Sequence, residues 1–301
     1  MVKRIGFIGL GHMGRWMALN LLKAAFELRV FDINAEAVRF LEDQGAAAAR
    51  TPAAVCEKAE VVFLCLPSAK VVEEVIFGED GLIHGAKSGL IIVDSGTTAY
   101  FQTLDFAQRL KERKIVFVDA PVTGMEARAQ AGNLTIMFGG DKTIFDLLRP
   151  AFGAIGKKAV HMGQVGAGQL GKLVNNLLFN VNIAALAEIL PMAAKLGLAP
   201  EKVCQVITTG TGRSFAAEFF IPLILENRFD QGYSLQNGYK DMTCAAELSA
   251  YHNIPMPLTH SATTTYQMAL AEGYGKENKG AMVKVFERLM RVEFRRRGEN
   301  G

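Results

Sequence analysis

The sequence predicts an α/β protein with two domains: a doubly wound, mostly parallel sheet in residues 1–162 and an all-helical domain in residues 163–301. Two observations predict this fold class. Short apolar strands alternate with amphipathic helices through the first half, which is typical of a sheet buried on both faces. From Gly163 the strand signals stop and a long apolar helix begins, which we expect to connect the two domains.

The composition is that of an ordinary globular protein. Of the 301 residues, 50% are hydrophobic and 21% are charged, with a net charge of +3 that is spread along the chain, so nucleic acid is not an expected partner. The basic cluster Arg295–Arg297, beside Arg291, reads as a solvated tail. Four cysteines lie too far apart for disulfide or metal spacing, and we expect no metal. No leader is visible and the apolar run Leu177–Leu190 is too short for a membrane span, which indicates a cytoplasmic protein.

The first strand leads directly into a glycine turn. Arg4–Ile8 is followed by GLGHMG and a predicted helix over His12–Ala25. In such a turn the first glycine permits the bend, the second lets a pyrophosphate approach the backbone, and the third lets helix and strand pack closely. Strand, glycine turn and helix at this spacing predict the dinucleotide-binding half of a Rossmann fold. The residues expected to hold the dinucleotide are Gly9, Leu10, Gly11, His12, Met13 and Gly14.

Asp32 directly follows the second predicted strand, Leu28–Phe31. A carboxylate there accepts hydrogen bonds from an adenosine ribose and repels a 2′-phosphate, so it favours NAD over NADP. No Arg or Lys follows it directly. The alternative is that Asp32 only caps the next helix.

Further apolar strands end in residues suited to a ligand. Ligands of doubly wound sheets lie beyond the carboxyl ends of the strands. Here these ends carry Leu66-Pro67, Ser95–Thr97 and Thr123-Gly124, although each stretch alone is also ordinary turn chemistry. The strands are predicted at Val61–Leu66, Leu90–Val93, Val116–Val118 and Leu134–Phe138, and the intervening helices at Val71–Phe77, Thr98–Arg113 and Lys142–Phe152.

Two polar residues interrupt the apolar helix after Gly163. Lys172 and Asn176 lie four residues apart and so share one helical face, where burial would be costly without a partner or a task. A Lys that only points to solvent is the plain alternative. We expect a kink or break at Pro191. Further helices are predicted near Pro200–Ile207, Ser214–Glu226, Leu235–His252, Leu258–Glu272 and Ala281–Val292.

Several motifs, in order along the whole chain, resemble the β-hydroxyacid dehydrogenase family. They are FIGLGHMGRWMALNLLK, DAPVTGMEARAQAGNLTIMFGG, GAGQLGKLVNNLL and the pair Lys240-Asp241. The resemblance implies that Lys172 is catalytic and that Thr123, Gly124 and Asn176 hold the substrate. It also implies that Leu66, Pro67, Thr97 and Lys240 contact the cofactor.

The implied reaction is hydride transfer between NAD and a small 3-hydroxy acid. Oxidation needs a base to take the hydroxyl proton while hydride leaves for the nicotinamide, and reduction needs the same group as an acid. Lys172 would fill this role, and its charge would stabilise a developing oxyanion. A reductase of small aldehyde acids, such as tartronate semialdehyde, glyoxylate or succinic semialdehyde, is the alternative direction. A binding module without catalysis and an imine reductase are both disfavoured because Lys172 is present.

Departures from the family bear on the substrate. Gly96 stands where the family usually has Ser, and Met125 stands where it commonly has Gly. Gly212-Arg213-Ser214-Phe215 resembles a stretch of 3-hydroxyisobutyrate dehydrogenases, and Arg213 could grip a substrate carboxylate or simply lie on the surface. We therefore expect a small hydroxy acid or aldehyde acid as substrate. The long apolar helix also predicts a homodimer or homotetramer.

Overall fold

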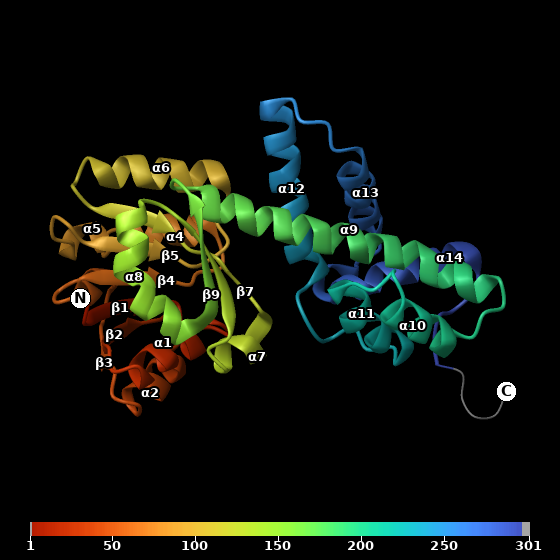
Figure 1. The fold of residues 1–301 in the computed structure, drawn as a ribbon, viewed down its shortest axis with the longest axis horizontal. Helices are drawn as coiled ribbons and strands as arrows, with labels where there is room; N and C mark the ends of the chain where they lie inside the picture. Colours follow the sequence, from red (N-terminus) through yellow and green to blue (C-terminus); the bar gives the residue numbers. More distant parts are fainter. Residues whose placement is uncertain (1, 297–301) are drawn as a thin grey trace. The chain divides into compact units, whose positions relative to one another are not determined.

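A computed structural model describes residues 2–296 of the chain. The chain divides into two compact units, Met1–Lys172 and Leu173–Gly301. This division falls inside the helix α9 (Ala167–Lys195), whereas the sequence placed the boundary between residues 162 and 163. Figure 1 shows the strands confined to the first unit and helices alone in the second, which confirms the predicted fold class.

The first unit is built on one mostly parallel sheet. Its strands are ordered β3-β2-β1-β4-β5-β6-β8-β7, with β9 paired to β8, and every pair from β3 to β6 is parallel. The carboxyl ends of β1, β4, β5 and β6 therefore lie along one edge. The strands are β1 (Arg4–Ile8), β2 (Glu27–Phe31), β3 (Ala47–Ala48), β4 (Val61–Leu64), β5 (Ile91–Asp94), β6 (Val116–Asp119), β7 (Val122–Thr123), β8 (Leu134–Gly139) and β9 (Gly156–Gly163).

The end of this sheet was only partly predicted. β8 runs antiparallel to β6 and β7, and β9 runs parallel to β8. The short strands β3 and β7 were not predicted, and neither was β9, whose residues are mostly exposed or half-buried and include Lys157 and Lys158. Without a buried apolar run, such an edge strand lacks the signal that marks the inner strands.

Helices cover both faces of the sheet, and each face has its own apolar core. Phe7, Phe63 and Phe152 belong to one cluster, and Ile8, Ile92 and Phe117 belong to the other, so neighbouring strand residues alternate between the two faces. The helices are α1 (Gly14–Lys23), α2 (Ala35–Glu42), α3 (Pro52–Val55), α4 (Ala69–Phe77), α5 (Leu82–Gly85), α6 (Tyr100–Lys111), α7 (Met125–Gln130) and α8 (Lys142–Ile155).

The second unit is a helical assembly around a separate core. Buried Ile183, Phe220, Met242 and Tyr266 come from four different helices and belong to one cluster. Beside the second part of α9, its elements are α10 (Pro200–Thr209), α11 (Phe215–Leu225), α12 (Leu235–His252), α13 (Pro257–Ala271), α14 (Val283–Met290) and two short 3-10 turns, Tyr274–Lys276 and Lys279–Met282.

The helix α9 does not break at Pro191. It is continuous over 29 residues, from Ala167 to Lys195. A proline removes one hydrogen bond and crowds the preceding turn, at a cost of about 3 kcal/mol. The residues on both sides of Pro191 pack into the core of the second unit, with Leu190 fully buried and Ala193 nearly so, and this burial holds the helix together.

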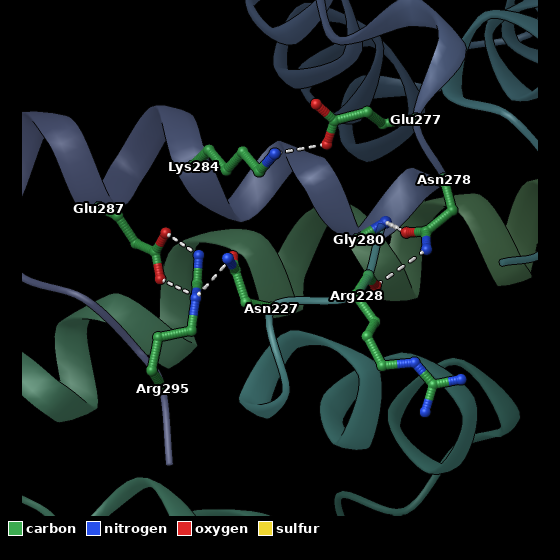
Figure 2. Close-up of polar contacts among 8 residues, drawn as sticks. All are labelled: Asn227, Arg228, Glu277, Asn278, Gly280, Lys284, Glu287 and Arg295. Carbon is green, nitrogen blue, oxygen red and sulfur yellow. Dashed lines mark hydrogen bonds and ion pairs between the residues drawn. The ribbon is translucent and has the colours of Figure 1, made fainter. Parts of the chain in front are cut away.

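Arg295 was wrongly expected to belong to a solvated tail, whereas Arg291 and Arg296 are exposed as expected. Arg295 donates two hydrogen bonds to Glu287 and a third to Asn227, and its side chain is only 19% exposed (Figure 2). In the same region Lys284 pairs with Glu277, at 2.5 Å. Glu287 is nearly buried, so its charge needs the Arg295 guanidinium. Arg297 lies outside the described residues.

Two findings bear on the expectations from composition. All four cysteines are free thiols. The helix α9 is long and apolar enough, by length and composition, to cross a membrane, and 56% of its most apolar window is buried inside the structure. A core helix of a soluble protein meets the same criteria.

Candidate active site

The glycine turn has the geometry of a dinucleotide cradle. Gly9 has φ +94°, and a Cβ on Gly14 would lie 1.9 Å from the Gly9 carbonyl oxygen, so neither position tolerates a side chain. A Cβ on Gly11 would meet nothing within 4 Å. The turn is therefore closely packed on its inner side and open at Gly11, where a pyrophosphate would approach. These residues fit a bound dinucleotide, with the N-terminus of α1 supplying free N–H groups. His12 is exposed, Met13 is half-buried and Leu10 is buried.

Asp32 is held in place at the end of β2. One carboxylate oxygen accepts a hydrogen bond from the Leu10 N–H at 2.5 Å, and the other accepts one from the Asn34 N–H at 2.7 Å. The helix α2 is capped by Asn34, whose side chain accepts from Glu36 and Ala37. Asp32 is thus not the helix cap, and its carboxylate is fixed beside the glycine turn, where the ribose of a dinucleotide would lie.

The predicted residues after β4 and β5 meet at the carboxyl edge of the sheet. A Cβ on Gly96 would lie 2.7 Å from the carbonyl oxygen of Leu66, which explains why a residue without a side chain stands there. The Gly96 N–H donates to buried Asp94 at 2.9 Å. Pro67 and Thr97 are exposed.

Lys172 lies beside the predicted substrate loop. Its ammonium donates a hydrogen bond to the carbonyl oxygen of Val122 at 2.8 Å, the residue directly before Thr123. Thr123 and Gly124 are half-buried and Met125 is 40% exposed. The first unit therefore brings the predicted catalytic amine to the segment with the predicted substrate-binding residues.

A buried carboxylate fixes the start of α9. Asp119, at the end of β6, accepts hydrogen bonds from the N–H groups of Gly166 at 2.6 Å and Gln169 at 2.8 Å. Burial raises the pKa of Asp119 to about 6, and these two N–H groups oppose the rise. A carboxylate against free N–H groups at a helix start is electrostatically favourable. Asp119 thus holds the helix that carries Lys172 against the sheet.

Gln169 joins this helix to the loop after β5. Its side-chain amide donates to the carbonyl oxygen of Gly96 at 3.0 Å and accepts from the Thr98 N–H at 3.2 Å. Thr98 in turn donates its hydroxyl to Asp94 at 2.6 Å. Burial raises the pKa of Asp94, and the hydrogen bonds from the Thr98 hydroxyl and the Gly96 N–H oppose this rise. The predicted cofactor loop and the catalytic helix are therefore parts of one buried network.

The other predicted residues belong to the second unit. Asn176 donates its amide to Asp241 at 3.1 Å and accepts from Asn175 at 3.2 Å, which leaves one amide N–H of Asn176 for a ligand. Lys240, beside buried Asp241, is exposed. Arg213 is 66% exposed and paired with Glu218 at the start of α11, so the described contacts do not join it to Asn176.

Sequence reasoning missed several of these supporting residues. Asp94 and Asp119 each end a predicted strand, a signal that could have identified them. Asp241 was recognised only as part of a motif. Gln169 has no signal in a single sequence, because its role depends on where the loop after β5 lies.

The chain is similar to known hydroxy acid dehydrogenases over almost its whole length. Residues 4–163 match the NAD binding domain of 6-phosphogluconate dehydrogenase, and residues 166–286 match the NAD-binding family of NADP-dependent 3-hydroxyisobutyrate dehydrogenase. The chain is 38% identical to 2-(hydroxymethyl)glutarate dehydrogenase of Eubacterium barkeri, covering 96% of each chain. It is 32% identical to 2-hydroxy-3-oxopropionate reductase of Escherichia coli, over 94% of this chain and 97% of the relative. The crystal structure of 3-hydroxyisobutyrate dehydrogenase from Salmonella typhimurium superposes with a TM-score of 0.86 at 28% identity, over 94% of this chain and all of the other.

The two matched family models and the relatives identify an NAD-binding oxidoreductase, in agreement with the Rossmann sheet, the open glycine turn and the helical unit. The chain belongs to the β-hydroxyacid dehydrogenase family. It is an NAD(P)-dependent 3-hydroxy acid dehydrogenase with NAD as its cofactor. The predictions of family, enzyme class and cofactor are confirmed.

Proposed function

We propose that the enzyme oxidises acids of the form HO–CH2–CHR–COO⁻ with NAD, and that Lys172 is the general acid and base. The observation that carries the proposal is the position of the Lys172 ammonium, which lies 2.8 Å from the Val122 carbonyl oxygen at the start of the Thr123-Gly124 loop. Bound NAD supplies the hydride acceptor. The chain's own residues must hold the carboxylate and take the hydroxyl proton.

Each role falls to a group with suitable chemistry. The Thr123 hydroxyl and the Gly124 backbone are the proposed donors for the substrate oxygens in the first unit. The remaining amide N–H of Asn176, one helical turn after Lys172 in α9, is proposed as a further donor. Lys172 removes the hydroxyl proton during oxidation and returns it during reduction, and its protonated form stabilises the oxyanion. Arg213, which is exposed and paired with Glu218, is given no role in this scheme, and its predicted contact with a substrate carboxylate stays a prediction.

The names of the relatives support this substrate class. 3-Hydroxyisobutyrate, 2-(hydroxymethyl)glutarate and glycerate, which is the reduced form of 2-hydroxy-3-oxopropionate, share the HO–CH2–CHR–COO⁻ core and differ in R. The reduction of an aldehyde acid is the second candidate, favoured by the Escherichia coli relative. NAD rather than NADP fits the fixed carboxylate of Asp32.

Initial rates test the proposal directly. The panel contains these three hydroxy acids with NAD and with NADP, and the matching aldehyde acids with NADH and NADPH. We expect an NAD-linked rate with at least one hydroxy acid. If no acid of this core reacts in either direction, the proposed substrate class is wrong.

Lys172→Ala tests the catalytic role. We expect turnover to fall by about 10²-fold or more, since a positioned acid or base contributes this much, while NADH affinity stays within a few-fold. Lys195→Ala, near the other end of α9, is the matched control. Near-normal turnover in Lys172→Ala would contradict the role given to this amine.

We also propose a homodimer or homotetramer in the cytoplasm. Ile189 and Met192 lie on one face of α9 in the second unit, and Leu196 directly follows the helix; they are 45%, 46% and 73% exposed. An exposed apolar stripe of this kind supports an interface between copies. Light scattering of Leu196→Asp should show a smaller particle than wild type, whereas Leu258→Asp, the control, should not. The free cysteines support the cytoplasmic location.

A further inference from the structure

One face of α1, the helix after the glycine turn, contacts α7, the helix after the predicted substrate loop. His12, Trp16 and Asn20 lie four residues apart along the glycine turn and α1, and all three contact α7. The indole N–H of Trp16 donates to Glu126 at 3.0 Å, and the imidazole of His12 lies 3.2 Å from the other oxygen of the same carboxylate. One turn further on, Asn20 donates to the Ala129 carbonyl oxygen at 2.8 Å.

The segment held in this way has an unfavourable backbone. Gly124 has φ +147° and Met125 has φ +62°. Met125 is not a glycine, so its left-handed conformation persists only when the surrounding structure fixes it. Glu126 is the next residue in the chain. Its contacts to α1 hold the Thr123–Met125 segment in a conformation that the backbone alone disfavours.

The Glu126 carboxylate is held by several groups of α1 and the glycine turn. Both of its oxygens face groups of α1 and the glycine turn, and Arg15 approaches at 3.9 Å. The Trp16 hydrogen bond, together with His12 and Arg15, lowers the pKa of the carboxyl. Trp16 is itself held edge-on by Phe40, with ring centroids 5.9 Å apart.

We propose that Glu126 is a positioning residue that couples the dinucleotide turn to the substrate loop. A dinucleotide bound on the turn restricts His12 and α1, and Glu126 transmits this restriction to α7 and to Thr123–Met125. Dinucleotide and hydroxy acid then bind cooperatively, because ordering by the first lowers the entropic cost of binding the second. This inference rests on the proposed substrate-binding role of Thr123 and Gly124.

Hydrogen exchange with NADH alone tests the coupling without any substrate. In wild type, NADH should slow amide exchange in residues 9–14 and also in residues 125–131. In Glu126→Ala the slowing at 125–131 should disappear while that at 9–14 remains. Glu112→Gln, an exposed carboxylate at the end of α6, is the control and should behave as wild type.

Tryptophan fluorescence adds a local readout, because Trp16 is the only tryptophan in the chain. Its emission should shift to longer wavelength in Glu126→Ala, as the indole loses its acceptor and becomes more hydrated. Glu126→Gln keeps an acceptor for the indole but loses the charge opposite His12. It should show a smaller shift and a partial loss of slowing at 125–131.

Kinetics separate positioning from a general structural role. With saturating NAD, the KM for the hydroxy acid in Glu126→Ala should rise about five-fold or more, the lower end of typical coupling between sites, while kcat changes less. Equal slowing at 125–131 in Glu126→Ala and wild type would overturn the inference. If Glu126→Ala does not fold, the same comparison in Glu126→Gln decides. Wild type that oxidises no acid of the panel would contradict the proposed function alone, since the exchange experiment needs only NADH.

Discussion

The buried carboxylate of Asp119 should make the first unit less stable as the pH rises from 5 to 7. Its pKa is raised to about 6, against 3.8 for a free Asp, chiefly because burial disfavours the charge. For a raised pKa, the contribution to stability is fully present below the unfolded value and is lost as pH rises through the folded value. The shift corresponds to about 3 kcal/mol in all, of which roughly 1 kcal/mol falls between pH 5 and 7.

Urea unfolding at the two pH values measures this loss. Trp16 fluorescence reports on the first unit, and protein concentration is held constant because self-association would shift the curve. Asp119→Asn lacks this titration. Its loss of unfolding free energy from pH 5 to pH 7 should therefore be about 1 kcal/mol smaller than that of wild type. This comparison cancels the titration of histidines common to both proteins.

Asp141→Asn is the matched control. Asp141 caps α8, and hydrogen bonds from Thr143 lower its pKa, so its stabilisation is lost only in acid, as pH falls toward the lowered value. The difference between pH 5 and 7 should therefore stay at the wild-type value. If Asp119→Asn also keeps the wild-type difference, the pKa assigned to Asp119 is wrong.

Three further outcomes follow from the geometry. Gly14→Ala should lose stability, because its Cβ would lie 1.9 Å from a carbonyl oxygen, whereas Gly11→Ala should unfold as wild type but bind NADH more weakly; thermal unfolding and NADH titration check the pair. Asp32→Ala should raise the ratio of kcat/KM with NADP to that with NAD, as a carboxylate that repels the 2′-phosphate is lost. Asp241→Ala should raise the substrate KM about ten-fold by releasing the Asn176 amide, with Asp241→Asn, which keeps an acceptor oxygen, closer to wild type in the same assay.

The inner strands and main helices were predictable because their signals are local. The strand Arg4–Ile8 and the helix Leu235–His252 were predicted with the bounds that the structure shows. In contrast, β9 depends on pairing with β8 rather than on its own apolar residues. The unbroken helix at Pro191 likewise depends on burial against other helices, which a local rule for proline does not include.

The site residues were predictable only where they belong to a sequence motif with a known chemical role. The glycine turn and Asp32 follow from known requirements of a dinucleotide. The roles of Asp119, Gln169 and Glu126 depend on partners that lie 47 to 110 residues away in sequence, and a single sequence does not show which side chains meet over such separations.

The anchoring of Arg295 has a consequence for the order of folding during synthesis. Phe294 is fully buried, its N–H donates to Glu287 at 2.7 Å, and Arg295 neutralises the same carboxylate. The core of the second unit is therefore incomplete until these residues have left the ribosome. The first unit needs only the chain up to Lys172, so it can fold much earlier. Nascent chains would thus pass through a stage in which the apolar helices of the second unit have been synthesised but their core is incomplete. At this stage the exposed apolar surface makes protection by chaperones most important.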